Sequence, residues 1–221
     1  MKMARLLLGL FIIVVASACS DDKGYDYGDF HYDMVTYLGT DNGAPKFEFQ
    51  AYDDSPLITL ISSKTGTLDM KKGQRILLNY IIDKEESETM KMVTVRGYSK
   101  VITDTMRIAA TSKLLPAKMD NIKLASIWRT GAYINIRCQV QYSEKPRQLM
   151  LIADLGTLNS SMVETYLIHD LFDATAYYWT PCYLSYYAGP AWNLLTCKTL
   201  RVNLNDLVYP SVKYYDFSKI K

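Results

Sequence analysis

The clearest strand signal in the chain is YINIRCQVQY, at residues 133–142. Two faces alternate along it without a break, with Ile134, Ile136, Cys138, Val140 and Tyr142 on one face and Asn135, Arg137, Gln139 and Gln141 on the other. A period of two residues is typical of a strand that buries one face and exposes the other. The pattern predicts an all-β fold in which the first set lies in the core and the second in solvent.

Shorter runs of the same kind precede this stretch. Asn42-Gly43 is a strong turn signal and predicts a hairpin over residues 32–52. Further strands are expected at residues 57–61, 75–82 and 90–101, the last with Gly97 at a bulge or corner. Five strands within about eighty residues fit a small closed barrel of the OB type. A six-stranded half-sandwich fits the same pattern nearly as well.

The apolar runs that follow residues 133–142 predict a second domain. Residues 147–154, 163–169, 199–204 and 212–217 read as strands, enough for an antiparallel β-sandwich. Residues 111–120 contain Pro116 and few large apolar side chains, so the boundary is placed there. We therefore expect an OB-like barrel over residues 29–111 and a C-terminal antiparallel sandwich over residues 112–221.

The N-terminus has the pattern of an export signal. Lys2 and Arg5 precede an apolar run that ends in small residues, which predicts a secretory signal peptide over residues 1–18. Cys19 follows directly in a sequence that resembles a lipobox, so we expect lipidation at Cys19 and a tether over residues 19–28. The expected location is the outer membrane, on either the periplasmic or the cell-surface face, with the membrane contacted through the lipid.

Charge and composition restrict the classes of partner. The 221 residues include 25 basic and 23 acidic side chains. Lys2 and Arg5 belong to the signal peptide, so 23 basic residues remain against 23 acidic ones. A charge-balanced chain lacks the basic surface that polyanion binding needs, and nucleic acid is not an expected partner. The 18 tyrosines, all outside the signal peptide, favour β structure.

Catalytic motifs are not found. The two histidines, His31 and His169, stand in no known hydrolase or zinc spacing, and Lys64-Thr65-Gly66 lacks the companion motifs of penicillin-binding enzymes. We interpret His31 and Asp33 as a polar strand face, and His169-Asp170 as a strand end beside a turn. No catalytic residue, metal or cofactor is expected, and the protein is predicted not to be an enzyme.

The chain resembles a known family over nearly its full length. The resemblance rests on Cys19 with its acidic neighbours and on five short motifs: residues 28–30, 72–80, 127–136, 167–170 and 200–204. These look like the NigD-like lipoproteins, described as an OB-like domain joined to a β-sandwich. The family name derives from a bacteriocin operon, so the resemblance implies an immunity or accessory role. Residues 174–195 are longer and more aromatic than the connection usual in the family.

That aromatic segment is the candidate binding surface. Seven Tyr and Trp residues fall within residues 177–192, interrupted by Pro181, Gly189 and Pro190, and we expect a loop there rather than a long regular element. Tyr and Trp suit partner or sugar contact because they offer rigid area with a polar end. The candidates are Tyr178, Trp179, Tyr183, Tyr186 and Trp192. The alternative is that the loop packs on the sandwich as a satellite core.

Cysteine spacing adds one covalent hypothesis. Cys182 and Cys197 lie in and just after the aromatic segment. In an oxidising compartment they are candidates for a disulfide, and the spacing leaves open whether they are bonded. Cys138 is expected to be a buried small hydrophobe.

The function expected from the sequence is that of an outer-membrane-anchored, non-catalytic binding or interaction module, associated with a bacteriocin. The partner would be another envelope protein or a glycan. The first alternative is a carbohydrate-binding accessory lipoprotein that uses residues 177–192. An envelope hydrolase is the less favoured one.

Overall fold

The computed structural model describes residues 29–66, 68–114, 119–144 and 147–219. The expected signal peptide, Cys19, the tether to residue 28, and Pro116 lie outside the described residues. Residues 31–221 form one compact unit. None of the helices among the described residues is both long and apolar enough to cross a membrane.

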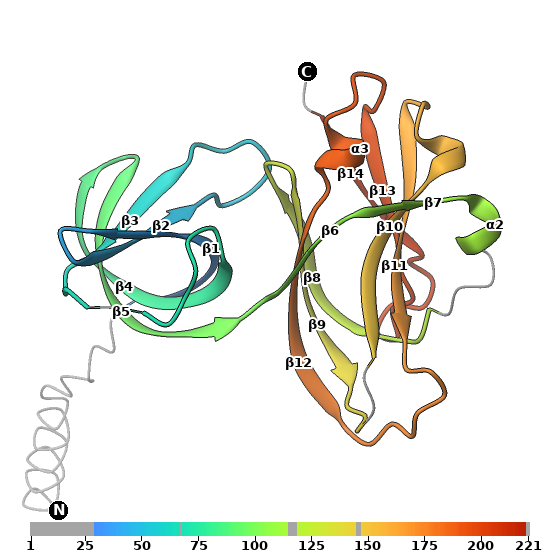
Figure 1. Ribbon diagram of the computed structural model, residues 1–221, viewed down its shortest axis with the longest axis horizontal. Coiled ribbons are helices and arrows are strands. Elements are labelled where there is room, and N and C mark those ends of the chain that lie inside the picture. Colours follow the sequence, from blue (N-terminus) through green and yellow to red (C-terminus); the bar gives the residue numbers. More distant parts are fainter. Residues whose placement is uncertain (1–28, 67, 115–118, 145–146, 220–221) are drawn as a thin grey trace, which may run out of the picture. The chain divides into compact units, whose positions relative to one another are not determined.

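The first five strands close into a barrel in the order β1-β2-β3-β5-β4 (Figure 1). They are β1 (Phe30–Asp41), β2 (Ala44–Phe49), β3 (Ile58–Ser62), β4 (Arg75–Ser87) and β5 (Met90–Lys100). β3 and β5 pair in parallel, whereas β1–β2, β2–β3 and β4–β5 pair antiparallel. This is the five-stranded OB arrangement. A single apolar cluster that includes Phe47, Leu60 and Tyr80 fills it.

Two local predictions in the barrel are confirmed. Asn42 and Gly43 both have positive φ, as a tight hairpin turn requires, and they join β1 to β2. The expected irregularity near Gly97 is a bulge: Asn79 and Tyr80 of β4 pair with Gly97 and Val95 of β5, which leaves Arg96 as the extra residue.

The remaining strands form two sheets. One has the order β14-β13-β11-β10-β7 and the other β6-β12-β9-β8. The strands are β6 (Ile102–Thr105), β7 (Arg107–Ala109), β8 (Lys123–Thr130), β9 (Tyr133–Gln141), β10 (Gln148–Asp154), β11 (Met162–Asp170), β12 (Trp179–Tyr187), β13 (Thr199–Asn203) and β14 (Tyr214–Ser218). Three short helical turns, α2 (Thr111–Leu114), η1 (Leu155–Thr157) and α3 (Gly189–Trp192), complete the described elements.

One strand path joins the two sheets. β6 pairs with β12 in one sheet, and β7, which follows after the single residue Met106, pairs with β10 in the other (Figure 1). Met106 is buried in the sandwich core, so the crossing places a methionine side chain between the layers. The chain therefore leaves the barrel at residue 101, ahead of the boundary expected at residues 111–112.

The predicted fold class, a barrel followed by a sandwich, is confirmed, and two details differ. The pairs β6–β12, β7–β10 and β11–β13 run parallel, so the sandwich is mixed rather than wholly antiparallel. The expected loop over residues 177–192 contains the nine-residue strand β12. Pro181 is tolerated there because β6 pairs only with Leu184–Tyr187, which leaves one side of β12 open beside the proline.

Residues 133–141 form β9, and the faces of this stretch follow the predicted alternation except at Asn135 and Tyr142. Tyr142, expected in the core, follows the end of β9 and is exposed. Ile134, Ile136, Cys138 and Val140 are buried in the sandwich core, and Arg137 and Gln139 are exposed. Asn135, expected in solvent, is fully buried. A residue of the barrel covers it, which the local pattern of β9 does not encode.

That residue is Arg75, at the start of β4. Its guanidinium donates to Asn135 Oδ1 at 3.0 Å and to Thr36 Oγ1 at 3.1 Å. Ser185 Oγ also donates to Asn135 Oδ1, at 2.8 Å, and Asn135 Nδ2 donates to Thr130 Oγ1 at 2.9 Å. The amide of Asn135 thus connects the barrel to three strands of one sandwich sheet, β8, β9 and β12.

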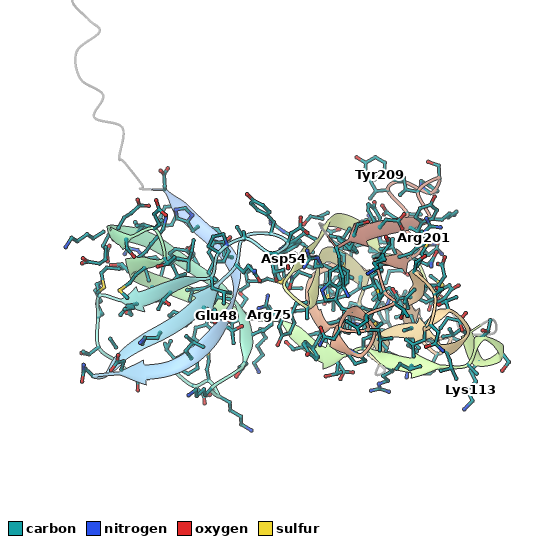
Figure 2. The ribbon with its side chains drawn as sticks, turned by 90° about the horizontal axis from the view of Figure 1, so that it is seen from above. Glu48, Asp54, Arg75, Lys113, Arg201 and Tyr209 are labelled. Atoms are coloured by element: carbon teal, nitrogen blue, oxygen red, sulfur yellow. The ribbon has the colours of Figure 1, made fainter. Side chains whose placement is uncertain are left out.

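Arg75 is itself 5% exposed, and burial lowers its pKa to about 10, so it remains charged at neutral pH. The guanidinium stacks over the ring of Tyr133 at 4.6 Å. Glu48, labelled with Arg75 in Figure 2, lines the same small cavity and opposes the fall in pKa. A buried cation whose acceptors are a neutral amide and a hydroxyl depends strongly on each of them.

We predict that Asn135→Ala lowers the free energy of unfolding by about 1–3 kcal/mol, because the buried guanidinium loses an acceptor. Urea unfolding followed by tryptophan fluorescence measures the change. Gln139→Ala, on the same face of β9 but exposed, is the matched control and should change stability by less than about 0.5 kcal/mol. Equal effects of the two substitutions would contradict a special role for the Arg75–Asn135 contact.

Candidate functional site

The outward face of the sheet β6-β12-β9-β8 carries half-buried aromatic side chains, the exposed Arg137 and the half-buried Lys123. Trp128 lies on β8, Arg137 on β9, and Trp179 and Tyr183 on β12, each with neighbours in sequence that point into the core. Tyr183 and Arg137 are paired across the two strands, and the guanidinium carbon lies 5.9 Å from the ring centroid. Lys123 Nζ lies 4.4 Å from the centroid of Trp179.

A cavity of about 360 Å³ opens on this face. Its walls include Trp128, Arg137 and Tyr183 from the sheet, and Tyr32, Asp33 and Tyr52 from the barrel and its β2–β3 connection. Tyr32 and Tyr52 are each more than half exposed. The volume is in the range of small-molecule sites, and the combination of aromatic walls with a few polar groups is typical of them.

Arg129 binds the β2–β3 connection, which contains Tyr52. This arginine, 1% exposed, makes two hydrogen bonds of 2.9 and 2.8 Å to the carboxylate of Asp54, which lower the pKa of Asp54. The Asp53 N–H donates to the Arg129 carbonyl and the Gly131 N–H donates to the Asp53 carbonyl. The connection after β2 is thereby fixed to the β8–β9 hairpin, and Tyr52 is positioned beside the sheet.

The charged groups at the cavity are one cation and one anion. The Arg137 guanidinium is exposed and has no ion-pair partner within the part of the chain that the structure describes. Asp33 accepts a hydrogen bond from the Tyr80 hydroxyl at 2.8 Å. The five donors of Arg137 are therefore available to a ligand, between two aromatic walls.

Comparisons with known proteins bear on the fold. No protein-family model and no curated protein matches the sequence. Solved structures do match: a protein of unknown function, DUF1344, from Bacteroides vulgatus has a TM-score of 0.68 at 15% identity, with 87% of this chain and 92% of that chain covered. A NigD-like immunity protein from Bacteroides caccae has a TM-score of 0.57 at 17% identity, covering 89% and 99%. The protein has the fold of the NigD-like proteins.

A third structure extends the comparison. A predicted lipoprotein from Bacteroides fragilis has a TM-score of 0.60 at 10% identity, with 86% of this chain and 98% of that chain covered. The NigD-like fold therefore spans most of this chain and nearly all of each compared chain, which confirms the resemblance expected from the sequence motifs. At these identities the structural similarity establishes the fold alone, and the function of the site depends on its own residues.

Within this NigD-like fold, the five predicted aromatic residues occupy different environments. Tyr183 lines the cavity, and Trp179 lies on the same outward face of β12. Tyr178 is exposed and stacks on Tyr142, with centroids 4.9 Å apart. Tyr186 and Trp192 are buried in the sandwich core, so the binding role expected of them does not hold. Tyr186 points inward by strand alternation, and Trp192 packs against the Arg129 guanidinium at 4.4 Å.

The expected disulfide between Cys182 and Cys197 is not present. Both cysteines are buried free thiols. Cys197 directs its thiol to the Thr199 carbonyl at 3.6 Å, whereas Cys182 lies opposite Cys138 on the neighbouring strand. The sequence separation permitted a bridge, and the strand pairing gives Cys182 a different neighbour.

Neither histidine belongs to a group of potential metal ligands among the described residues. Groups of three or more His, Cys, Asp or Glu side chains suited to a metal ion are not found among the described residues. His31 stacks on Tyr80, with centroids 5.1 Å apart. His169 is 1% exposed and its Nδ1 lies 3.2 Å from the Asp120 carbonyl, an arrangement in which the neutral ring donates from Nδ1.

Of the residues that line the cavity, the sequence indicated Tyr183 as a binding residue and did not indicate others, among them Tyr32, Tyr52, Trp128 and Arg137. Trp128 and Arg137 were visible as members of strand patterns, and the outward position of Arg137 was predicted. The sequence did not predict that they lie beside Tyr32 and Tyr52, because this proximity depends on the contact between the β2–β3 connection and the β8–β9 hairpin.

Burial lowers the pKa of His169, although the Asp120 carbonyl opposes the shift. The unfolded chain takes up a proton near pH 6.5, which the folded chain resists. Stability is therefore fully present above about pH 6.5 and falls as the pH drops below that value. We predict that His169→Asn flattens this dependence in urea titrations between pH 5 and 8. A pH dependence identical to that of the unchanged protein would contradict the assignment.

Proposed function

We propose that the protein is a non-catalytic binding module, held at the outer membrane by lipid on Cys19, that takes its partner at the aromatic cavity. The observation that carries this proposal is the cavity lined by Trp128, Tyr183, Tyr52 and Tyr32, together with Arg137, which has no ion-pair partner among the described residues. Rigid aromatic side chains with a single arginine are the composition of binding hot spots. Cys19 lies outside the described residues, and its role rests on the sequence.

A bacteriocin-associated role is the first form of the proposal. One structural neighbour is described as a NigD-like immunity protein and another as a predicted lipoprotein. An immunity or accessory protein needs a surface that recognises one partner protein, and an open cavity with aromatic walls on a rigid sheet supplies one. The partner would then be a bacteriocin or another envelope protein, which inserts an apolar or anionic side chain between the rings.

A glycan is the second candidate, and the arrangement of polar groups favours it specifically. Sugar rings present apolar C–H faces that stack on Trp and Tyr, and hydroxyls that need donors and acceptors at the edges. Asp33, Gln50 and Arg137 line the same cavity as the aromatic rings and supply both kinds of group. The volume of about 360 Å³ lies within the range of small-molecule sites.

Substitution at the cavity tests the binding site. We expect Arg137→Ala and Tyr183→Ala to weaken binding of any ligand that the unchanged protein binds by roughly 10-fold to 100-fold. Central aromatic and arginine contacts are worth about 1–3 kcal/mol. Calorimetric titration with a panel of purified oligosaccharides, and with the co-encoded bacteriocin, provides the measurement. Tyr209→Ala is the matched control, because Tyr209 is as exposed as Tyr32 but lies outside the cavity.

The two candidates give different results. Binding of the bacteriocin alone, with a deletion strain sensitised to it, supports the immunity role, and binding of an oligosaccharide alone supports the glycan role. Binding that Arg137→Ala and Tyr183→Ala leave unchanged would place the site elsewhere and overturn the proposal.

Anchoring is tested separately. We expect the unchanged protein to be labelled by a fatty-acid probe and to fractionate with the outer membrane, because two or three acyl chains suffice for stable attachment. Cys19→Ala should abolish the label and release the protein from the membrane fraction. A labelled Cys19→Ala variant would show that Cys19 is not the lipidated residue.

A further inference from the structure

Cys138 and Cys182 lie directly opposite each other on two paired strands. The antiparallel register of β9 and β12 joins Ile136 to Leu184, Cys138 to Cys182 and Val140 to Thr180. Both cysteines belong to the sandwich core cluster, at 3% and 5% exposed. Their side chains therefore point to the same face of the sheet, toward each other and away from solvent.

The pairing type gives their separation. Pro181, opposite Gln139, has no N–H, so it cannot form the doubly hydrogen-bonded kind of antiparallel pair. The two kinds of pair alternate along a ladder, which makes Cys138–Cys182 the hydrogen-bonded kind, with Cα atoms about 5.5 Å apart. Disulfides span Cα separations of about 4.4–6.8 Å, and this pair lies within that range. Their Cβ atoms must come within about 4.5 Å, which asks for a small local approach of the two strands.

The environment of the thiols bears on their reactivity. The hydrogen bond between the two thiols raises the pKa of Cys138, as does burial, and lowers the pKa of Cys182. The thiolate is the reacting species in disulfide exchange, and a buried pair is also out of reach of an oxidant. Because burial keeps both thiols from an oxidant in the folded protein, the bond forms in the folding chain, before the core closes.

We propose that Cys138 and Cys182 are a disulfide-forming site, oxidised during folding by a disulfide reagent of low molecular weight or by a protein disulfide. One thiolate attacks the reagent and displaces a thiolate from it. The second cysteine thiolate then attacks the mixed disulfide and releases the other half. Two cysteine thiols and one disulfide reagent become one protein disulfide and two reagent thiols. Cys197 takes no part, since its thiol faces the Thr199 carbonyl.

The bond would fix the candidate binding face. Arg137 precedes Cys138 and Tyr183 follows Cys182, and these two residues are paired across the same strands. A covalent link between the neighbouring positions on the inner face holds Arg137 and Tyr183 in register on the outer face. This consequence rests on the proposed function, whereas formation of the bond does not.

Refolding of the mature chain in defined redox buffers tests the site. The chain from residue 19 onward, carrying Cys19→Ser, is refolded with oxidised glutathione or with an excess of reduced glutathione. We expect the oxidised sample to lose about 2 Da in intact mass, to show one reactive thiol in denaturant instead of three, and to give a peptide that links Cys138 to Cys182. Its melting temperature should rise by roughly 5–15 °C.

Single variants separate the alternatives. Cys197→Ala is the matched control, because Cys197 is buried in the same core, and it should keep the bond and the thermal shift. Cys138→Ala and Cys182→Ala should each abolish both, with a circular dichroism spectrum under reducing conditions as the check on folding. A linked peptide between Cys182 and Cys197, or three free thiols after oxidative refolding of the unchanged chain, would overturn the proposal. Neither outcome depends on whether a ligand binds at the cavity.

Discussion

The hydrogen bond from Arg75 to Asn135 connects the two halves of the structure. It joins the first residue of β4 in the barrel to the centre of a sandwich sheet, and both side chains are buried. Asn135 also accepts from Ser185 and donates to Thr130, so its amide group meets three partners at once. A buried cation without these acceptors would be strongly destabilising, which is why the relative register of the barrel and this sheet is well specified.

The second connection, at Arg129, has a different chemistry. It is a charge-paired contact in which a buried guanidinium binds an exposed carboxylate, that of Asp54, while Trp192 covers the guanidinium from the core side. Trp192 was expected to bind a partner, and its actual contact is with this arginine. The contacts of Arg75 and Arg129 together bring β1 and the β2–β3 connection to the outward face of the sheet, where the aromatic cavity lies.

The cavity distinguishes this protein more than its fold does. The NigD-like fold occurs in proteins that are described in different terms, and a barrel of the OB type is compatible with many ligands. The cavity is more specific because its five aromatic side chains and Arg137 come from segments that are distant in the sequence. Cys138 and Cys182, the candidate disulfide pair, lie on the inner face of the same sheet. They are adjacent in sequence to Arg137 and Tyr183, which line the cavity on the outer face.

The sequence by itself determined the local structure. Alternation over residues 133–142 predicted that Ile134, Ile136, Cys138 and Val140 enter the core, Asn42-Gly43 predicted the first hairpin, and Gly97 predicted a bulge or corner. Each is a property of neighbouring residues. The same alternation placed Tyr183 and Trp179 on one face of β12 once that segment is known to be a strand. The motifs that carried the family resemblance were likewise strand patterns, and the fold they implied is the one observed.

Only the tertiary structure decided what covers each outward face. Asn135 is buried because a barrel arginine reaches it, Trp192 because a second arginine packs on it, and Cys182 faces Cys138 because of the register between β9 and β12. The continuation of one strand path across both sheets at Met106 is equally non-local. Periodicity reports the side of an element on which a residue lies, whereas burial and partnership on that side depend on segments 40 to 60 residues or more away in the chain.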